Sequence, residues 1–385
     1  MPYRRVFGIS NLALLRKKVK KAVRKKLKVF VGMSGGVDSS VAAYLLKKQG
    51  YDVVGVFMKN WTETMVNDGK SLHNSVDLCP WVTDQEDMRN VCIKLKIPFY
   101  TFDFEKEYKE KVIEYFYKSY KKGITPNPDI MCNKEIKFKL FLNKCLSLGA
   151  DFIATGHYAQ IREVKRNKYQ LLKGKDANKD QSYFLCTLNQ YQLSKTLFPI
   201  GIYTKTAVRS MAKKINLSTH DKKDSQGICF IGEVDLKEFL KIRLKEDPGK
   251  IKTTDGEIIG NHIGLPFYTI GQRRGINIGG GIPYYVVAKD IKANELIVAK
   301  GSHDPKLFCK TLTADHIHWL DVEPKFPLNC TAKIRYRQKD QRVTVTKISP
   351  NVLSAVFKEP QRAITPGQSI VFYRASVLIG SAVIT

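Results

Sequence analysis

The chain has 385 residues, of which 43% are hydrophobic and 26% charged, so it is long enough for two or three domains with buried cores. No apolar run approaches the roughly 18 residues that a membrane-spanning helix needs, and the composition excludes a disordered or fibrous chain. The 65 Lys and Arg outnumber the 36 Asp and Glu and give a net charge of +29, which favours a polyanionic partner such as nucleic acid. A Lys-rich proteome with solvated surfaces is the alternative source of this excess.

The first 28 residues contain eleven Lys or Arg and no acidic residue, and the apolar residues from Leu12 to Leu27 follow helical spacing. Three interpretations stay open for this basic helix: an RNA-binding arm, a mitochondrial transit peptide and a solvated extension. Transit peptides favour Arg and Ser, whereas this stretch is mostly Lys. We therefore expect a mature extension of a cytoplasmic protein, with the mitochondrial matrix as the alternative location.

Apolar runs alternate with helical patterns from residue 28 onward. The expected strands are Lys28–Met33, Tyr51–Met58, Ile97–Phe104 and Ala150–Ala159, and the expected helices lie at 38–48, from about 84, at 105–121 and at 134–148. Strands that are apolar throughout and separated by helices are typical of a parallel sheet covered on both faces. The pattern predicts a doubly wound α/β domain.

Beyond about Cys229, and after a helix expected at 234–244, short strands with Gly-rich turns replace this alternation. They are expected at 255–259, 265–270, 284–288, 295–299, 331–337, 342–348, 352–357, 369–373 and 376–384. Such spacing predicts a small barrel or sandwich. The predicted organisation is a basic extension (1–27), a doubly wound catalytic domain (28–236), a small central domain (237–304) and a C-terminal β-barrel (305–385).

A glycine-rich loop, residues 32–40 (GMSGGVDSS), lies between the first strand and the first helix; we call it the phosphate loop. Its small residues let backbone N–H groups converge on an anion at a helix N-terminus. Asp38 could cap the helix or help to hold Mg²⁺, while Ser34, Ser39 and Ser40 offer hydroxyls. Neither the Walker A pattern nor the GxGxxG fingerprint is present. A Gly-rich turn with an Asp cap is the purely structural alternative.

The SGGVDS run within this loop resembles the pyrophosphatase loop of the PP-loop ATPases. Members of that superfamily cleave ATP between its α and β phosphates and adenylate a substrate oxygen. The resemblance implies ATP with Mg²⁺ as cosubstrate and leaves the substrate open.

Two cysteines lie in polar surroundings. Cys132 directly precedes the helix expected from Lys134, where a helix N-terminus and a lysine favour a thiolate, and Asp129 could act as acid or base. Cys229 lies in a glycine-bracketed run. A buried, inert thiol is the alternative for either. The cysteines within apolar patterns, expected in the core, are Cys92, Cys145 and Cys186.

The eight cysteines include no CxxC pair, so no dedicated metal cage is expected. A pair of accessible thiols beside an ATP-activating loop suits sulfur transfer. Adenylation turns a carbonyl oxygen into a leaving group, a sulfur nucleophile displaces AMP, and a second thiol releases that sulfur by forming a disulfide.

Nine segments in chain order, from about residue 28 to 384, resemble the tRNA-specific 2-thiouridylases of bacteria and mitochondria. They are GMSGGVDSSVAAYLL, GVFMKNW, GITPNPDIMCNKEIKF, LGADFIATGHYAQI, NKDQSYFL, DSQGICFIGE, YTIGQRRG, IRYRQ and TPGQSIVFY. The resemblance implies adenylation of the wobble uridine (position 34) at its C2 carbonyl oxygen, followed by sulfur transfer from a protein persulfide. It further implies tRNAs for Lys, Glu and Gln as substrates and a cysteine desulfurase relay as donor.

The resemblance also implies roles for matching residues. ATP would be bound by Gly32, Met33, Ser34, Gly35, Gly36, Val37, Asp38, Ser39, Met58 and Gly156. The target base would face Asn127, Pro128 and Asp129, with Asp129 the acid/base, and tRNA would contact His157, Lys179, Asp180, Gln181, Arg335, Tyr336 and Gln368. Cys229 would carry the persulfide, and Cys132 would be the nucleophile that attacks it, leaving a transient Cys132–Cys229 disulfide.

Purely structural interpretations of these positions stay open. His157 could be a hydrogen-bonded strand-end histidine, residues 179–181 an ordinary polar turn, and Arg335 with Arg337 one solvated face of a barrel strand. Two rival functions also stay open. Another PP-loop synthetase would share SGGVDS without needing the two cysteines, and a basic RNA-binding protein would bind RNA without releasing AMP. Residues 1–27 and 63–81 match nothing functional in the family.

Overall fold

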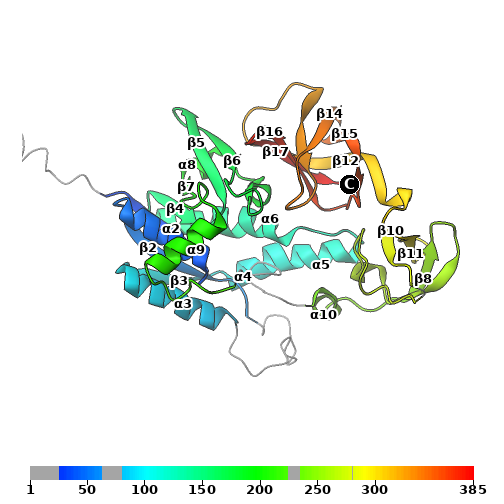
Figure 1. Ribbon diagram of the computed structural model, residues 1–385, viewed down its shortest axis with the longest axis horizontal. Coiled ribbons are helices and arrows are strands. Elements are labelled where there is room, and N and C mark those ends of the chain that lie inside the picture. The colour runs from blue at the N-terminus through cyan, green and yellow to red at the C-terminus, as the bar shows by residue number, and fades with distance from the viewer. Residues whose placement is uncertain (1–25, 63–79, 224–234, 280) are drawn as a thin grey trace, which may run out of the picture.

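The computed structural model describes residues 26–62, 80–223, 235–279 and 281–385. The basic extension before residue 26 and the persulfide candidate Cys229 lie outside these ranges. Three parts are visible in Figure 1: a domain built on a parallel sheet, a small domain built on a mixed sheet, and a β-barrel that contains the C-terminus. None of the helices in the described ranges is long and apolar enough to cross a membrane.

The first domain is built on a fully parallel sheet in the order β3-β2-β1-β4-β7. Its strands are β1 (Lys28–Met33), β2 (Asp52–Lys59), β3 (Phe99–Asp103), β4 (Phe152–Thr155) and β7 (Thr196–Leu197). The strand order reverses between β1 and β4. In open α/β sheets, ligands bind beyond the carboxyl ends of the strands at such a switch point.

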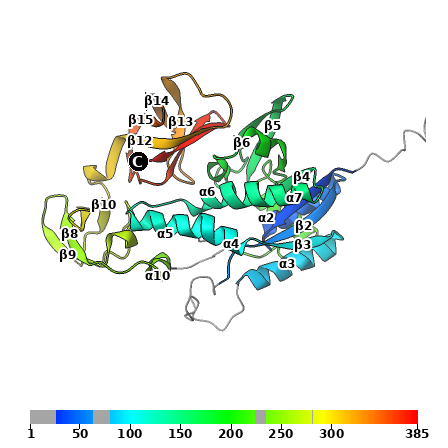
Figure 2. The same ribbon diagram turned by 180° about the vertical axis from the view of Figure 1, so that it is seen from behind.

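Alternate residues of β1 pack against opposite layers of helices. Val29 and Val31 belong to the core beneath α2 (Val37–Lys48), α3 (Pro80–Leu95) and α9 (Lys205–Lys214), whereas Phe30 belongs to the core on the other face. Two helical runs cover that second face, and Figure 2 shows them crossing the molecule toward the other two domains. They are α4 (Glu105–Tyr108), η2 (Lys109–Ile113) and α5 (Glu114–Lys121), then α6 (Pro128–Cys132), η3 (Asn133–Phe141) and α7 (Leu142–Ser147). The predicted doubly wound domain is therefore confirmed.

We call the continuous run Pro128–Ser147 the cysteine helix, because Cys132 lies in its first turns. It begins six residues earlier than the sequence pattern predicted, so Cys132 lies inside the helix instead of ahead of it. The cause is local: the Asn127 side chain accepts a hydrogen bond from the Ile130 N–H at 3.1 Å, and Pro128 suits the first helical position.

The segment between β4 and the central domain contains a hairpin and short helices. They are β5 (Ala159–Lys165), β6 (Lys168–Lys173), η4 (Ser182–Leu185), α8 (Gln190–Ser194) and α10 (Leu236–Lys241). The predicted strand Ala150–Ala159 is shorter than expected, since β4 ends at Thr155 and the chain turns before β5.

The central domain has a sheet in the order β10-β11-β8-β9. Its strands are β8 (Gly249–Thr253), β9 (Ile258–His262), β10 (Tyr284–Asp290) and β11 (Glu295–Lys300). The strand predicted at 265–270 is wrong: Leu265–Phe267 form one turn of 3₁₀ helix, η5, with a proline in its first positions. The strand was predicted from the apolar residues around this proline. Proline has no N–H to donate to a neighbouring strand, so a strand is disfavoured here.

The C-terminal domain is a closed barrel, as one of the two predicted alternatives stated. A short turn, η6 (Pro305–Leu307), leads into it, and its strands are β12 (Phe308–Trp319), β13 (Leu328–Lys333), β14 (Gln341–Ser349), β15 (Val352–Arg362), β16 (Ser369–Arg374) and β17 (Val377–Ile384). They pair in the order β12-β15-β14-β13-β16-β17, and β17 pairs back with β12. The start of β17 also pairs with β6, with Leu378 opposite Leu171, so the barrel sheet continues into the first domain.

Candidate functional site

The phosphate loop leaves the carboxyl end of β1 as a tight turn held by its own hydroxyls. The Ser34 N–H donates to Ser39 Oγ at 3.2 Å, and the Ser40 hydroxyl donates to the Gly36 carbonyl oxygen at 2.7 Å. Gly35 has φ +69°, and a Cβ there would lie 2.2 Å from the Asp84 carbonyl oxygen. The turn therefore requires glycine at this position.

Helix α2 starts from this loop without a side-chain cap. Its N-cap is Gly36, which makes no side-chain cap hydrogen bond, so the predicted alternative of Asp38 as the cap is wrong. The Asp38 carboxylate instead accepts hydrogen bonds from the Tyr158 hydroxyl at 2.7 Å and from Lys205 Nζ at 2.8 Å. An uncapped helix N-terminus with converging N–H groups is suited to an anion.

The ends of β2 and β4 close around the loop. Gly156 follows β4, and a Cβ there would lie 2.7 Å from the Ser39 nitrogen. Met58, near the end of β2, is buried, and its Cε would be 3.1 Å from a Cβ at Gly32. The residues predicted to bind ATP, which are distant in sequence, thus lie together at the switch point of the sheet.

His157, a predicted tRNA contact, is buried two residues beyond β4. Its Nδ1 lies 2.7 Å from Thr155 Oγ1, and its ring packs against Phe138 and Phe198. Burial, aided by the nearby Lys137 cation, lowers the pKa of His157 well below its usual value. The imidazole is therefore neutral at physiological pH.

The barrel contacts the start of the cysteine helix. Asn127 Nδ2 donates to Gln368 Oε1 at 3.2 Å, and Gln368 Nε2 donates to the carbonyl oxygens of Thr125 and Pro126 at 2.9 and 3.0 Å. A Cβ at Gly367 would lie 2.2 Å from Ile124 Cγ2, so the two segments are in close contact. Asp129 is half-buried in the first turn of the helix.

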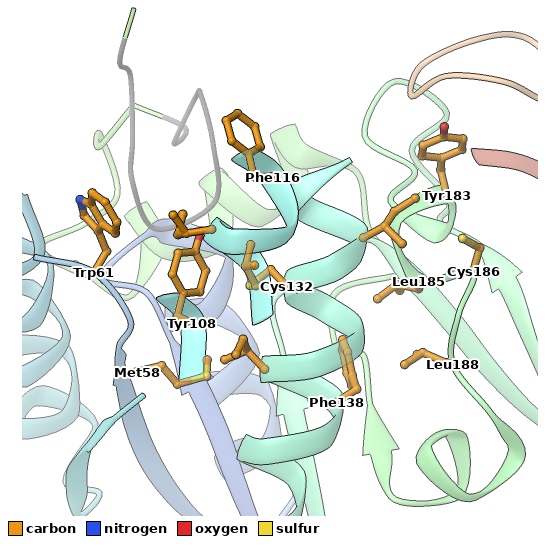
Figure 3. Packing of buried hydrophobic residues seen from close by; sticks show 14 of the residues in the cluster. Met58, Trp61, Tyr108, Phe116, Cys132, Phe138, Tyr183, Leu185, Cys186 and Leu188 are labelled. Carbon is orange, nitrogen blue, oxygen red and sulfur yellow. The ribbon is translucent and has the colours of Figure 1, made fainter. Parts of the chain in front are cut away.

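Cys132 is fully buried in the core on this face of the sheet. Figure 3 shows it on its helix in the same cluster as Met58, Tyr108 and Leu185. Burial of the cysteines predicted in the core is confirmed: Cys92, Cys145 and Cys186 are inaccessible, and burial raises the pKa of Cys92 and of Cys186 to about 12.

Cys229 lies outside the described residues, but the described residues on either side are well anchored. On one side, Lys222 Nζ donates to Asp84 Oδ1 at 2.7 Å and to Asp87 Oδ2 at 2.5 Å, which ties it to α3. On the other side, Asp235 caps α10, whose Phe239 packs against Trp61, Phe116 and Tyr117 in the same core as Cys132.

Asp180 and Gln181, predicted to contact tRNA, make internal hydrogen bonds. The Gln181 side chain accepts from the Tyr158 N–H at 2.9 Å. Asp180 is buried and forms a 3.1 Å ion pair with Lys333 of the barrel, and the Lys333 ammonium lies above the ring of Tyr373. Lys179, the third residue of this predicted group, is half-buried.

Arg335 and Tyr336 lie in a turn after β13, so the alternative of one face of a barrel strand is wrong. The Arg335 guanidinium donates to the Arg362 carbonyl oxygen. Burial lowers the pKa of Arg335, and the nearby Arg362 cation lowers it further. Tyr336 packs against Phe184, with ring centroids 4.6 Å apart. The aromatic pair joins the barrel to the segment that follows Gln181.

Sequence reasoning missed Tyr158 and Lys205, the two partners of Asp38. They lie 120 and 167 residues beyond it in the chain, and neither belongs to a motif that would have marked it. Within the described ranges, no group of three or more His, Cys, Asp or Glu side chains is arranged to hold a metal ion.

The fold and the loop define a doubly wound α/β protein with a glycine-rich loop at the switch point of its sheet, extended by two β domains. Three family models match it in chain order: the tRNA methyl transferase HUP domain over residues 27–233, the tRNA methyl transferase PRC-barrel domain over 237–300 and the Aminomethyltransferase beta-barrel domain over 309–384.

The curated relatives are more specific. Proteins named tRNA-specific 2-thiouridylase MnmA from Halalkalibacterium halodurans and Alkaliphilus oremlandii are each 52% identical to this chain, over 94% of it and over 95% and 97% of their own lengths. One named tRNA-specific 2-thiouridylase MnmA 1 from Geobacillus kaustophilus is 53% identical over 94% of this chain and 96% of its own. The chain belongs to the tRNA-specific 2-thiouridylase family, and the predicted family is confirmed.

Proposed function

We propose that this protein is a tRNA-uridine 2-sulfurtransferase. It activates the C2 carbonyl oxygen of the wobble uridine, position 34, with ATP, replaces that oxygen with sulfur, and releases AMP and diphosphate. The proposal rests mainly on one observation: the chain is 52% identical in sequence, over 94% of its length, to proteins named tRNA-specific 2-thiouridylase. The phosphate loop at the sheet's switch point supports it on physical grounds.

ATP is proposed to bind against the phosphate loop, with Gly156 and Met58 beside it. Glycine at 35 and 156 lets the loop pack closely against the backbone of Asp84 and lets the end of β4 pack closely against Ser39, which fixes the shape of the loop. The loop residues 32–40 contain one carboxylate, Asp38, which is too few to hold Mg²⁺ alone. Mg²⁺ would therefore arrive bound to the nucleotide, whose phosphate oxygens would supply most of its ligands. The ion would offset charge on those phosphates.

The proposed sulfur transfer uses the two cysteines. Cys229 carries a persulfide received from a cysteine desulfurase relay, and the Cys132 thiolate attacks its inner sulfur. The Cys132–Cys229 disulfide forms, the S–S bond of the persulfide breaks, and the outer sulfur leaves as hydrosulfide with the bonding electron pair. Hydrosulfide adds at C2 of the adenylated uridine and AMP departs, with Asp129 handling the proton. A thiol reductant must then reopen the disulfide.

The buried position of Cys132 imposes a condition on this proposal. Its side chain is inaccessible in the described structure, and a buried thiol cannot attack a persulfide that arrives from another segment. We therefore propose that packing around the start of the cysteine helix opens when substrate binds. The contacts of Gln368 with Asn127, Thr125 and Pro126 place the barrel where binding of tRNA could drive that change.

We propose the tRNAs for Lys, Glu and Gln as the substrates and the cytoplasm as the place of action. The net charge of +29 supports a polyanionic partner. The bacterial origin of the relatives supports the compartment.

The test uses the full chain with tRNA, Mg-ATP and a sulfide or persulfide source, followed by mass spectrometry of the tRNA nucleosides. We expect 2-thiouridine together with stoichiometric AMP. RNA binding without AMP would identify a non-enzymatic RNA-binding protein. With a persulfide source, Cys132→Ser should stop thiolation; normal thiolation by this variant would remove Cys132 from the mechanism. AMP release by the wild type without 2-thiouridine would point to another PP-loop chemistry.

A further inference from the structure

Arg362, the last residue of β15, extends from the barrel to the central domain. Its guanidinium carbon lies over the ring of Tyr285 in β10, 4.8 Å from the ring centre, and its Nη1 is 3.9 Å from where a Cβ at Gly271 would lie. The backbone beneath it is fixed, because the Ala363 N–H donates to the Leu307 carbonyl oxygen at 2.7 Å. The arginine therefore lies where the two β domains meet.

A second arginine lies beside it. The Arg335 guanidinium donates to the Arg362 carbonyl oxygen, and the pKa of Arg335, which burial lowers, is lowered further by the Arg362 cation. In the described part of the chain, neither guanidinium forms an ion pair with a carboxylate. Two half-buried cations repel each other, and an anion bound between them removes that repulsion.

Other arginines without a carboxylate partner surround this pair. Arg273 and Arg274 are exposed in the loop that begins at Gly271, and Arg337 is exposed two residues after Arg335. None of them forms an ion pair within the described ranges. Arginine presents a planar fork of donors that matches the oxygens of a phosphate. The residues that we call the arginine junction are Arg273, Arg274, Arg335, Arg337 and Arg362.

The arginine junction lies next to the place proposed for the target uridine. The barrel loop that follows Arg362 leads to Gln368, which contacts Asn127 and the carbonyl oxygens of the two residues before it. A uridine that enters beside Asn127 carries a phosphate on each side, because phosphates join it to its neighbours. The RNA backbone therefore passes close to this loop.

We infer that Arg362 binds a backbone phosphate of the anticodon loop beside the target uridine, as part of an RNA-binding surface that the barrel and the central domain form together. The inference rests on the proposed tRNA substrate and adds an interface to it. The ring of Tyr285 orients the guanidinium before RNA arrives. Guanidinium groups beside aromatic rings suit RNA, whose phosphates and bases they contact.

The experiment measures binding of an unmodified lysine tRNA transcript to the full chain, by fluorescence anisotropy over a series of KCl concentrations. Each phosphate contact to a single strand contributes about 0.7 to the slope of log affinity against log salt. Arg362→Gln should weaken binding about tenfold and flatten this slope by about 0.7. Arg362→Lys keeps the charge but not the fork, so it should keep the slope and regain part of the affinity.

Arg89→Gln is the matched control. Arg89 also lies over an aromatic ring, that of Phe99, and it is exposed on α3, which packs on the opposite face of the sheet from the cysteine helix. The substitution removes the same charge, and the slope should stay that of wild type. An unchanged slope in Arg362→Gln would overturn the inference. Equal flattening in the two variants would also overturn it, because only the net charge would then matter.

Tyr285→Leu separates phosphate binding from a purely structural role of Arg362. It removes the ring beneath the guanidinium and keeps the charge, so we expect a smaller loss of affinity and the wild-type slope. If Arg362 acted only by holding the barrel against the central domain, Tyr285→Leu and Arg362→Gln would weaken binding alike and neither slope would change. That result would reject phosphate binding.

The outcomes also separate this inference from the proposed function. A wild-type protein that does not bind tRNA would reject both, whereas 2-thiouridine formation by wild type with an unchanged slope in Arg362→Gln would reject only the role of Arg362. Binding of ATP without tRNA should be equal in wild type and Arg362→Gln; weaker ATP binding would place the arginine at the nucleotide and overturn the inference. In thiolation assays, Arg362→Gln should raise the KM for tRNA and leave kcat near that of wild type, because the backbone contact is made equally before and during the reaction.

Discussion

At the scale of single residues, the site depends on places where no side chain fits. A Cβ at Gly156 would lie 2.7 Å from the Ser39 nitrogen and 2.8 Å from the Asp38 carbonyl carbon, which are backbone atoms that cannot move aside cheaply. Gly156 therefore sets the distance between β4 and the phosphate loop.

We expect Gly156→Ala to push the loop from β4, to destabilise the fold by about 1–3 kcal/mol and to weaken ATP binding at least tenfold. Denaturant unfolding and nucleotide titration would measure these two effects. Gly279→Ala is the matched control, since nothing lies within 4 Å of a Cβ there. Normal ATP affinity in Gly156→Ala would show that the loop does not depend on this close approach.

A second prediction concerns His157, whose pKa burial lowers well below the ordinary value of 6.5. Below pH 6.5 the unfolded chain therefore binds a proton at His157 that the folded chain does not bind. The free energy of unfolding has its full value above pH 6.5 and decreases as the pH falls below 6.5. The limiting slope is about 1.4 kcal/mol per pH unit. Unfolding curves at pH 7.5, 6.5 and 5.5 should show a steeper loss for wild type than for His157→Gln; parallel losses would contradict this.

At the residue level, the sequence located the phosphate loop between β1 and α2, because the signal for that loop is local. The phosphate loop is contiguous, and its small residues mark it without any knowledge of the fold. Tyr158 and Lys205 reach Asp38 from distant parts of the chain, and a lone Tyr or Lys carries no pattern of its own. Only the sheet order, which places β4 and α9 beside β1 and α2, makes these partners visible.

At the scale of elements, the cysteine helix shows how a start signal can be overlooked. Asn127 followed by Pro128 is a cap followed by a proline at the first helical position, yet the predicted helix began only at Lys134. The wrong strand at 265–270 has the opposite cause, because apolar residues outweighed a proline.

Asn127→Ala should remove both the helix cap and the hydrogen bond to Gln368, with a loss of about 1–2 kcal/mol in the free energy of unfolding. We expect thiolation to fall further than stability explains, because the helix start positions Asp129 and Cys132. Asn189→Ala, which removes the cap of α8, should lower stability by a similar amount and leave thiolation intact. Equal activity in the two variants would argue against a special role for this helix start.

At the scale of the whole molecule, the barrel is attached to the first domain through buried charge. The Asp180–Lys333 pair joins segments 153 residues apart, and its side chains are 3% and 9% exposed. Neighbouring Gln181 holds the Tyr158 backbone, and Tyr158 contacts Asp38. A continuous set of hydrogen bonds therefore runs from the barrel to the phosphate loop.

Lys333→Met should leave the Asp180 carboxylate buried without its cation and lower the free energy of unfolding by about 3–5 kcal/mol. Adding Asp180→Asn should recover part of this loss, since the unpaired charge is gone. Lys347→Met removes an exposed pair with Glu323 within the barrel domain and should lower it by less than about 1 kcal/mol. Additive losses from Asp180→Asn and Lys333→Met would show that the pair is not coupled.

The sequence predicted the three-part order of the chain, because hydrophobic periodicity changes where one fold type follows another. It could not predict the contacts between those parts. Pairing of β17 with β6 depends on the register of two short strands that are remote in the chain, and many other registers satisfy the same apolar pattern.

That pairing has a consequence for any attempt to study the barrel alone. Strand β12 covers β17 from Gly380 to Ile384, and β6 covers its first residues. A fragment beginning near residue 305 would keep its ring of strands but present bare N–H and C=O groups where the hairpin once lay. Unpaired strand edges recruit other strands, so two such fragments would tend to join edge to edge, and their apparent size in solution would reflect the cut and not the native protein.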